Sequence, residues 1–345
     1  MITSATITAT GRTSDPLDHT AIVRGDPAFN IDATDLLEIG RSPVRWVNLP
    51  PPEADPKPNL LGLLRCMWLA PSLLSATYAR RPDTYTALTS TCPSCKSVST
   101  AKVCRACGRK RVQVPSVRDW AGAATYCTQW SGQQTASGRL IVPPQQWDAA
   151  ADMTASLVRD PCTLELEQQS DKLCLISGTW HDAATGLDIP VHCNLDFAPR
   201  TGNSLDMTIG SLTLSADADP AAWTTNAYNH GAHIRAALKQ ALHAAATGDP
   251  RSTHVWCICE RSEPYITARR RAAPELLAKG QDTLAQLLGA YAQCLKTRTW
   301  PAFDATAPGS LNAWSQVYLE PWMTQGSGGG ASYFALAAPA TPPEP

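Results

Sequence analysis

The sequence predicts a mixed α/β domain that carries a cysteine-rich insertion, and two observations support this prediction. First, residues 172–215 contain three short apolar or alternating runs, which are typical of strands, and further helical and strand-like runs follow as far as residue 298. Second, residues 84–118 contain four cysteines and seven lysines or arginines but no aspartate or glutamate. A chain of 345 residues is long enough to bury a sizeable core.

The elements can be placed in order from periodicity and from residues that start or stop helices. Residues 1–30 are polar and irregular, so we expect a flexible N-terminal arm. A first helix is expected to start at Thr34 or Asp35 and to end at Pro43. The other expected helices are 59–81 (interrupted at Pro71), 144–159, 233–248 and 274–298, and the expected strands are 172–180, 187–197, 205–215, 252–261 and 264–271. One domain, residues 31–323, therefore holds the insertion at 84–118, and a disordered tail, residues 324–345, follows it.

Composition and charge limit the classes of function. Hydrophobic residues make up 43% of the chain and the net charge is -1, so nucleic-acid binding would require local basic patches. The first residues lack the pattern of a signal peptide, and no apolar run approaches the roughly 20 residues of a membrane helix. We therefore expect a cytoplasmic protein, without membrane contact, whose thiols are reduced.

Four cysteines in the insertion have the spacing of a metal site. Cys92 and Cys95 form one C-x2-C pair, and Cys104 and Cys107 form a second pair eight residues later. Two such pairs supply the four thiolates of a closed, tetrahedral zinc site. Because a closed site has no free position for substrate, the sequence predicts a structural zinc ion. The other cysteines lie in apolar stretches and are expected in the core: Cys66, Cys127, Cys162, Cys174, Cys193, Cys257, Cys259 and Cys294.

Basic residues surround these cysteines: Lys96, Lys102, Arg105, Arg109, Lys110, Arg111 and Arg118. Two interpretations remain open at this point. The basic run either lies along a phosphate backbone, or it keeps a small module in solution and offsets the negative zinc-thiolate centre. The run of arginines at 269–271 likewise either extends a basic rim or forms a solvated face.

Several stretches, in their order and spacing, resemble one nuclease family. They include "DLLEIGRSPVRW", "LLGLLRCMWLAP", "NLDFAPRTG", "GSLTLSADADPAAW" and "VYLEPWM". With them, residues from about 33 to 323 resemble the exonuclease VIII (RecE-type) family of phages and prophages, within the PD-(D/E)xK nuclease-like superfamily. The resemblance implies an α-β-β-β-α-β core with a mixed sheet. It also implies Mg²⁺-dependent 5′–3′ degradation of duplex DNA from its ends, in recombination, inside a bacterial host cell.

Matched position by position, the resemblance implies a degenerate catalytic site. The family's first carboxylate corresponds to Asp196, whereas its second carboxylate and its lysine correspond to Ser211 and Thr213. The family's upstream histidine and its helical glutamine fall at Arg65 and Arg235. One aspartate with two hydroxyls is a poor site for Mg²⁺, which prefers several oxygen ligands. We therefore expect a nuclease fold without nuclease chemistry.

Other residues are candidates to replace the lost groups. Asp206 follows Asp196 at a plausible distance, but Thr208 then takes the lysine position. Lys239 in the following helix either reaches the site or lies on a solvated face. Glu260, at the end of a predicted strand, either supplies a carboxylate or is a surface charge.

The two arginines at family positions have two interpretations. Arg65 and Arg235 either bind DNA phosphates together with Lys102, Arg105, Arg109, Lys110 and Arg111, or they pair with nearby acids. Among the histidines, His230 and His233 form a close pair, for which a structural role is expected.

Three functions follow from these features. The first is an inactive RecE-like protein that binds double-stranded DNA, DNA ends or a recombination partner protein. The second is an active Mg²⁺-dependent exonuclease with relocated catalytic residues, and Mg²⁺ is an expected cofactor only in that case. The third is an assembly or inhibitor protein that uses the fold as a scaffold. The family resemblance is compatible with a homo-oligomer.

Overall fold

The structure is a computed structural model that describes residues 2–9, 24–49, 57–99, 101–200, 208–250 and 252–301. The chain divides into two compact units: residues Met1–Pro52 with Ser156–Pro345, and residues Glu53–Ala155. The second unit is larger than the insertion expected at 84–118. The flanking helices have ordinary composition, so only the part rich in cysteine and basic residues could be recognised in the sequence. Four parts of the predictions lie outside the described residues: residues 10–23 of the expected arm, the role of Asp206, residues 302–323 of the expected domain and the tail at 324–345.

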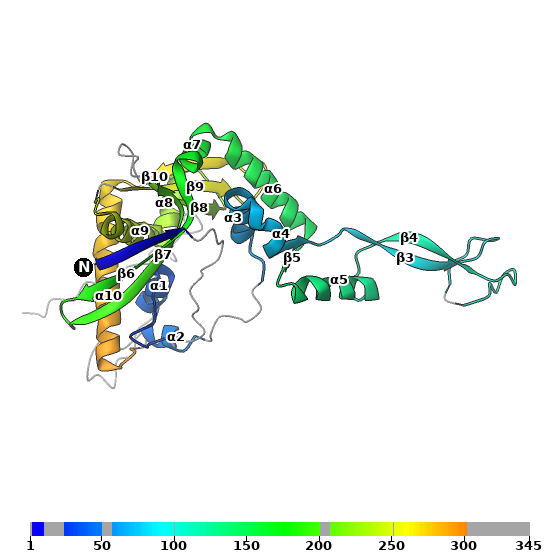
Figure 1. Cartoon of the computed structure of the whole chain (residues 1–345), viewed down its shortest axis with the longest axis horizontal. Helices are drawn as coiled ribbons and strands as arrows, with labels where there is room; N and C mark the ends of the chain where they lie inside the picture. Colours follow the sequence, from blue (N-terminus) through cyan, green and yellow to red (C-terminus); the bar gives the residue numbers. More distant parts are fainter. Residues whose placement is uncertain are drawn as a thin grey trace, which may run out of the picture. The chain divides into compact units, whose positions relative to one another are not determined.

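The first unit contains a six-stranded mixed sheet with the order β1-β6-β7-β8-β9-β10 (Figure 1). All neighbouring pairs are antiparallel except β8 and β9, which run parallel. The strands are β1 (Ile2–Ala9), β6 (Ser170–Asp182), β7 (Leu187–Pro199), β8 (Thr208–Ser215), β9 (Thr253–Glu260) and β10 (Thr267–Arg271). The predicted mixed α/β architecture is confirmed, and all five predicted strands are present.

Residues 2–9 correct one expectation. Instead of belonging to a loose arm, they form β1, which pairs antiparallel with β6 from Ile2 opposite Trp180 to Ala9 opposite Cys174. The physical reason is the alternation in "ITSATITA", whose β-branched residues favour an extended backbone once an adjacent strand offers hydrogen bonds.

Helices α1, α9 and α10 bury their apolar faces against the sheet. The helices of this unit are α1 (Ala33–Arg41), α2 (Pro43–Val47), α7 (Pro161–Gln169), α8 (Pro220–Asn229), α9 (Ala232–Thr247) and α10 (Pro274–Thr297). Their shared core includes Trp46 and Tyr291, whose rings meet edge to face with centroids 5.6 Å apart. This packing fixes α9 against the strands that carry the predicted catalytic positions.

The first helix starts at Ala33, just before the predicted start at Thr34 or Asp35. Asp32, not Thr34 or Asp35, is its N-cap, and the Asp32 carboxylate accepts hydrogen bonds from the amides of both Thr34 and Asp35. The Asp35 carboxylate in turn accepts a hydrogen bond from the Asp32 amide, and the two residues together form a capping box. Burial, followed by the nearby Asp32 charge, raises the pKa of Asp35. Several acidic or hydroxyl residues in succession leave the cap ambiguous in a sequence.

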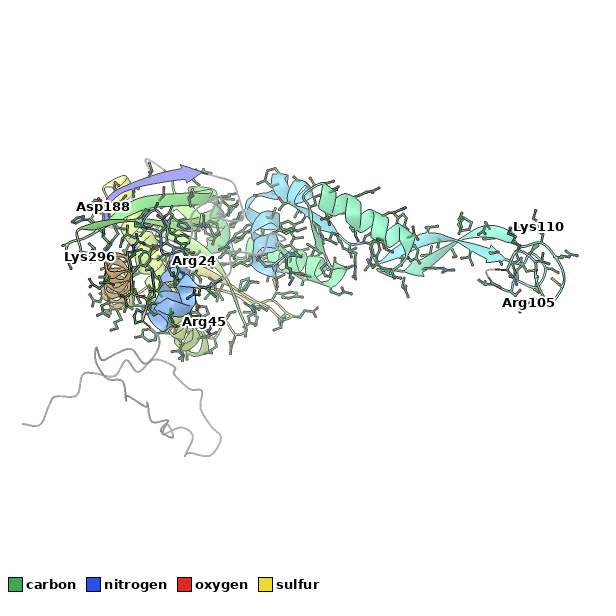
Figure 2. The ribbon with its side chains drawn as sticks, turned by 90° about the horizontal axis from the view of Figure 1, so that it is seen from below. Arg24, Arg45, Arg105, Lys110, Asp188 and Lys296 are labelled. Atoms are coloured by element: carbon green, nitrogen blue, oxygen red, sulfur yellow. The ribbon has the colours of Figure 1, made fainter. Side chains whose placement is uncertain are left out.

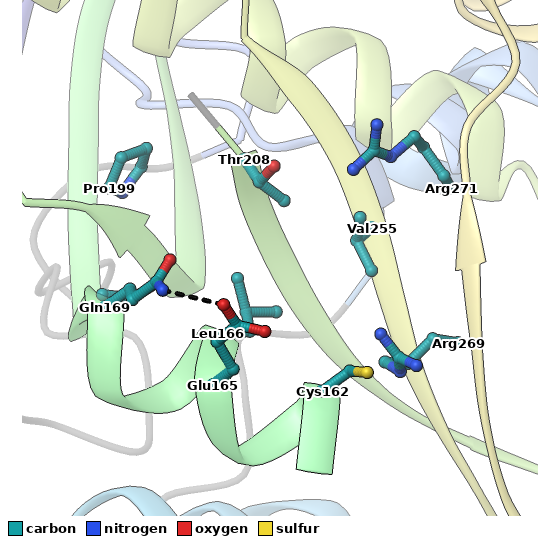
Figure 3. A pocket seen from close by; sticks show the side chains of 10 residues that line it. Cys162, Glu165, Leu166, Gln169, Pro199, Thr208, Val255, Arg269 and Arg271 are labelled. Carbon is teal, nitrogen blue, oxygen red and sulfur yellow. Dashed lines mark hydrogen bonds between the residues drawn. The ribbon is translucent and has the colours of Figure 1, made fainter. Parts of the chain in front are cut away.

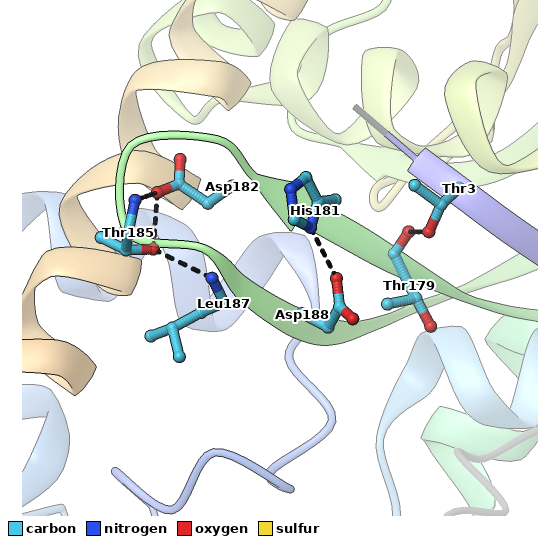
Figure 4. Close-up of polar contacts among 7 residues, drawn as sticks. All are labelled: Thr3, Thr179, His181, Asp182, Thr185, Leu187 and Asp188. Carbon is cyan, nitrogen blue, oxygen red and sulfur yellow. Dashed lines mark hydrogen bonds and ion pairs between the residues drawn. The ribbon is translucent and has the colours of Figure 1, made fainter.

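The turn between β6 and β7 is closed by side chains (Figure 4). Asp182 Oδ2 accepts hydrogen bonds from the Thr185 amide at 2.8 Å and the Thr185 hydroxyl at 2.7 Å. Gly186 follows with a φ of 74°, which glycine adopts without strain. One pair nearer the body of the sheet, His181 Nδ1 lies 2.8 Å from Asp188 Oδ1.

We expect Asp182→Ala to lower the free energy of unfolding by about 1 kcal/mol, because Thr185 loses its acceptor. The hydrogen bonds from Thr185 lower the pKa of Asp182 in the folded state. The contribution is therefore present above the carboxyl's unfolded pKa and is lost as the pH falls through the lowered folded value. Urea titrations at pH 7 and near pH 3 test this: the difference between wild type and variant should shrink at the lower pH. A constant difference would contradict it.

The second unit contains short helices and two small sheets. Its elements are α3 (Leu60–Leu69), a 3-10 turn (Pro71–Leu73), α4 (Leu74–Thr77), β2 (Tyr78–Arg80), β3 (Thr84–Thr91), β4 (Val112–Asp119), α5 (Thr125–Ala136), β5 (Leu140–Val142) and most of α6 (Pro144–Arg159). β2 and β5 pair in parallel beside a core that includes Leu63, Cys66 and Val142.

Within the described ranges, no single helix is both long and apolar enough to cross a membrane. Only α3 taken together with Pro71–Thr77 passes that test, as a pair bent by 114°.

Candidate functional site

The cysteine-rich segment forms a hairpin that ends in two loops. β3 and β4 pair antiparallel over eight residues each, from Thr84 opposite Asp119 to Thr91 opposite Val112. The four cysteines lie in the loops beyond the paired strands. A two-stranded hairpin is at best marginally stable in water, so this one needs an additional source of stability at its end.

The two C-x2-C loops have the same backbone geometry. The Cys92 carbonyl accepts from the Lys96 amide at 3.0 Å, and the Cys104 carbonyl accepts from the Gly108 amide at 2.8 Å. Lys96 and Gly108 both have positive φ, 60° and 71°. Glycine suits this left-handed position, as expected for Gly108, whereas the first loop places a lysine there. The repeated geometry directs both thiols of each loop to one centre.

The thiols of Cys92, Cys95, Cys104 and Cys107 form a cluster in which all four sulfur atoms lie within 4.8 Å of one another. The Sγ–Sγ distances include 3.3 Å for Cys92 and Cys107 and 3.4 Å for Cys95 and Cys104. Four sulfurs at about 2.3 Å from a tetrahedral zinc ion would be about 3.8 Å apart. The distance of 4.0 Å between Cys95 and Cys107 is close to this value, and the two shorter distances lie a little below it. The cluster can hold a metal ion such as zinc.

The acidity of the thiols agrees with this interpretation. The hydrogen bond from Ser97 is the largest cause that lowers the pKa of Cys104, to about 5. At Cys107, the hydrogen bond from the Arg109 amide also lowers the pKa. The hydrogen bond with Cys92 and burial act in the opposite direction and together raise the pKa of Cys107 to about 12. Because adjacent thiolates repel one another, a bound cation would allow all four to ionise together.

Four of the residues predicted to bind DNA are exposed beside this cluster, namely Lys102, Arg105, Arg109 and Lys110, and Lys96 is exposed there as well. Figure 2 shows Arg105 and Lys110 at the end of the hairpin with their side chains directed away from it. Arg111 is different, because its guanidinium donates to the carbonyl oxygen of Ser97 and to its hydroxyl, the latter at 3.0 Å. Arg111 therefore connects the two loops internally, and its expected role in DNA binding stays a prediction.

The hairpin also exposes apolar side chains. Leu88 and Val117 are 69% and 72% exposed and belong to cross-strand pairs two positions apart, Leu88 with Pro115 and Thr86 with Val117. They therefore share one face of the ribbon. The hairpin thus presents apolar and cationic groups to its surroundings.

The positions predicted from the resemblance to be catalytic lie on adjacent strands in the first unit. Asp196 is on β7 and Ser211 and Thr213 are on β8, and the Asp196 carboxylate accepts a hydrogen bond from the Leu212 amide at 2.7 Å. Asp196 is 2% exposed and Ser211 is 5% exposed. The expected first carboxylate is thus buried and bound to the backbone of the neighbouring strand.

Lys239 and His254 both contact Ser211. The Lys239 ammonium donates to Ser211 Oγ at 2.5 Å, and His254 Nε2 lies 3.1 Å from the same oxygen. Lys239 therefore does not lie on a solvated helix face, and this interpretation of the sequence was wrong. Burial, followed by the Lys239 charge, lowers the pKa of His254 well below its ordinary value, so its imidazole is neutral at pH 7. A neutral imidazole nitrogen can accept a hydrogen bond from the Ser211 hydroxyl.

His254 was absent from the predicted site residues. Its strand could be recognised in the sequence, but the parallel pairing of β9 with β8, which sets Ile209 opposite His254, could not. This pairing spans more than 40 residues of sequence.

Two other proposed residues have structural contacts. Glu260 Oε1 accepts a hydrogen bond from the Ala218 amide at 2.8 Å, so its carboxylate fixes the loop before α8. Arg235 donates to the His230 carbonyl at 2.6 Å, and burial lowers its pKa. Arg65 lies half-buried on α3, in the second unit.

A cavity of about 210 Å³ lies beside β8, β9 and β10 in the first unit (Figure 3). Arg269 and Arg271 line it from β10, whereas Arg270 donates to the Ala218 carbonyl elsewhere, so the three arginines do not form one continuous rim. Arg269 is held by an ion pair with Asp160 at 3.0 Å. Cys162 also lines this cavity and is exposed, which corrects its expected place in the core.

No protein-family model and no curated protein sequence matches the chain. Two solved structures share limited similarity. A candidate exonuclease from Eubacterium rectale is 11% identical, with a TM-score of 0.37, over 56% of this chain and 71% of that chain. Rai1 from Scheffersomyces stipitis, in complex with (3′-NADP)⁺ and calcium ion, is 8% identical, with a TM-score of 0.27, over 68% of this chain and 59% of that one. Similarity of this degree assigns neither a family nor an activity to this chain.

Proposed function

We propose that this chain is a catalytically inactive, RecE-like nuclease-fold protein that binds double-stranded DNA through a zinc-stabilised basic hairpin. The observation that carries the proposal is the exposure of Lys102, Arg105, Arg109 and Lys110 beside the four-thiol cluster. No acidic side chain lies between residues 84 and 118 to neutralise them. Cations held in this way on a rigid loop bind phosphates without reading sequence. The setting we propose is phage or prophage DNA recombination or processing.

The proposed inactivity follows from the contacts of Ser211. The family's chemistry needs a second carboxylate at this position to hold Mg²⁺, and here a hydroxyl accepts a hydrogen bond from the Lys239 ammonium. A cationic ammonium beside the serine opposes the binding of a second cation. Asp196 is then the one retained carboxylate, and it is bound to the Leu212 amide.

A single experiment tests both parts. Zinc-loaded protein is incubated with linear duplex DNA in Mg²⁺ and then in Mn²⁺, and degradation and gel shift are scored together. We expect a shift without degradation, with an apparent affinity that falls steeply with salt. Replacing Lys102, Arg105, Arg109 and Lys110 by glutamine should reduce the slope of log K against log salt by about 0.9 for each phosphate that the variant no longer neutralises. A matched variant neutralises four exposed cations elsewhere, Arg41, Arg45, Arg261 and Lys296, and should change the slope much less.

The alternative of an active nuclease has one observation in its favour, the reach of Lys239 to Ser211. Degradation that disappears in Asp196→Ala would establish this alternative and contradict the proposed inactivity. If the protein causes no gel shift and no degradation at low salt, that result would contradict DNA binding. It would favour the scaffold function, in which a protein is the partner.

A further inference from the structure

The first unit contains a second cavity, of about 370 Å³, that the proposed function does not use. Its lining comes from α1, from α10, and from the junction of α8 and α9, and includes Leu37, Tyr228, His233, Ile234, Lys279 and Leu287. Most of its exposed surface is apolar, and no aspartate or glutamate lines it. A cavity of this size and composition is typical of sites for small apolar ligands.

The lining of this cavity carries a positive charge. Lys279 lines it, and among the described residues no side chain or backbone group is paired with its ammonium group. The N-terminus of α9 is at the same cavity, where Gly231, with a φ of 70°, is the N-cap and no side chain caps the first amides. The free amides and the dipole of a 16-residue helix favour an anion at this point.

His233 contributes a buried ring to the cavity lining. It is 5% exposed, it lines the cavity, and its Nδ1 atom has no hydrogen-bond partner. Its ring stacks on Tyr228 with centroids 4.4 Å apart and planes inclined by 11°. Burial, followed by the Lys279 charge, lowers the pKa of His233, so the imidazole is a neutral wall and Lys279 is the cation. A buried polar atom without a partner is uncommon unless a ligand or water satisfies it.

From these observations we propose that the cavity binds an apolar carboxylic acid in its ionised form. The carboxylate lies between the Lys279 ammonium and the first amides of α9, and the hydrocarbon part contacts Leu37, Ile234 and Leu287. An acid fits better than a neutral or cationic compound, because the lining holds a cation and a helix N-terminus but no anion.

The test uses decanoate, decanol and decyltrimethylammonium, which share one alkyl chain, and measures displacement of the fluorescent probe 8-anilinonaphthalene-1-sulfonate. We expect decanoate to displace half of the probe at a concentration at least 10-fold lower than decanol does. The cationic compound should bind most weakly. Lys279→Ala should remove the preference for decanoate and leave decanol unchanged. Lys296→Ala, on the same helix but outside the cavity, is the matched control and should retain the preference.

A second variant keeps the test independent of the charge. Thr283→Phe places a ring in the cavity from the same helix, and it should weaken all three compounds while circular dichroism remains unchanged. Equal binding of decanoate and decanol, or a preference that survives Lys279→Ala, would overturn the proposal. So would decanoate binding that Thr283→Phe leaves intact, because the compound would then bind elsewhere. DNA binding by the hairpin is measured separately, so failure of one proposal does not affect the other.

Discussion

Replacement of Cys104 by serine is expected to abolish tight zinc binding and to unfold the β3–β4 hairpin. Cys104 is buried, and its thiol lies 3.4 Å from that of Cys95. Loss of one of four thiolate ligands should weaken zinc binding by more than about 100-fold, since changes to outer-shell partners alone cost 10- to 100-fold. Apart from the zinc site, the ribbon has little buried surface, with Leu88 and Val117 mostly exposed. Binding free energy is therefore folding free energy in this module.

The measurement is zinc content per chain, together with amide hydrogen exchange. Wild type should hold one equivalent of zinc, and amides of residues 84–119 should exchange fast in Cys104→Ser or after chelation. The first unit should keep its protection, because its sheet and core belong to a separate compact unit. Cys162→Ser is the control: this cysteine is exposed and lies in the first unit, so zinc content should not change. Protection of the hairpin without metal would contradict the structural role of zinc.

Local patterns predicted most of the secondary structure. The helix at 144–159 was predicted with the bounds that α6 has, because Pro143 and Pro144 mark its start and its apolar residues recur at helical spacing. Gly248 was expected to close α9 and does so in the left-handed conformation, with a φ of 73°. In contrast, β1 has only a weak local signal, the alternation in "ITSATITA", and its pairing with β6 joins residues more than 160 positions apart.

The candidate sites also differ in whether local sequence patterns can predict them. Cys92, Cys95, Cys104 and Cys107 could be grouped from spacing, because two turns supply all the ligands. The contacts of Ser211 with Lys239 and His254 could not be predicted, since they depend on how α9 packs on the sheet and on which strand lies beside β8. The structural roles of Arg111 and Glu260 could not be predicted either, because the sequence does not show whether a backbone group lies within reach of a charged side chain.

Helices α9 and α10 approach each other closely at Gly280, so a substitution at this residue is expected to change the free energy of unfolding strongly. A Cβ atom at Gly280 would lie 2.4 Å from the carbonyl oxygen of His233 and 3.1 Å from Ala237 Cβ. The first of these atoms belongs to the backbone, so a side-chain rotation cannot relieve the overlap, and one helix must move. We expect Gly280→Ala to lower the free energy of unfolding by about 3 kcal/mol, although alanine is favoured over glycine in a helix by about 1 kcal/mol.

Gly289 is the matched control, because it lies on the same helix and a Cβ atom there would come no closer than 3.9 Å to Asp182 Oδ1. Helix propensity then acts without opposition, so Gly289→Ala should raise the free energy of unfolding by up to about 1 kcal/mol. Urea unfolding of both variants measures the difference. Stabilisation by both substitutions would contradict the close packing of α9 and α10. Because Lys279 and His233 lie at this contact, the movement that alanine forces at residue 280 should also reshape the cavity they line and weaken decanoate binding.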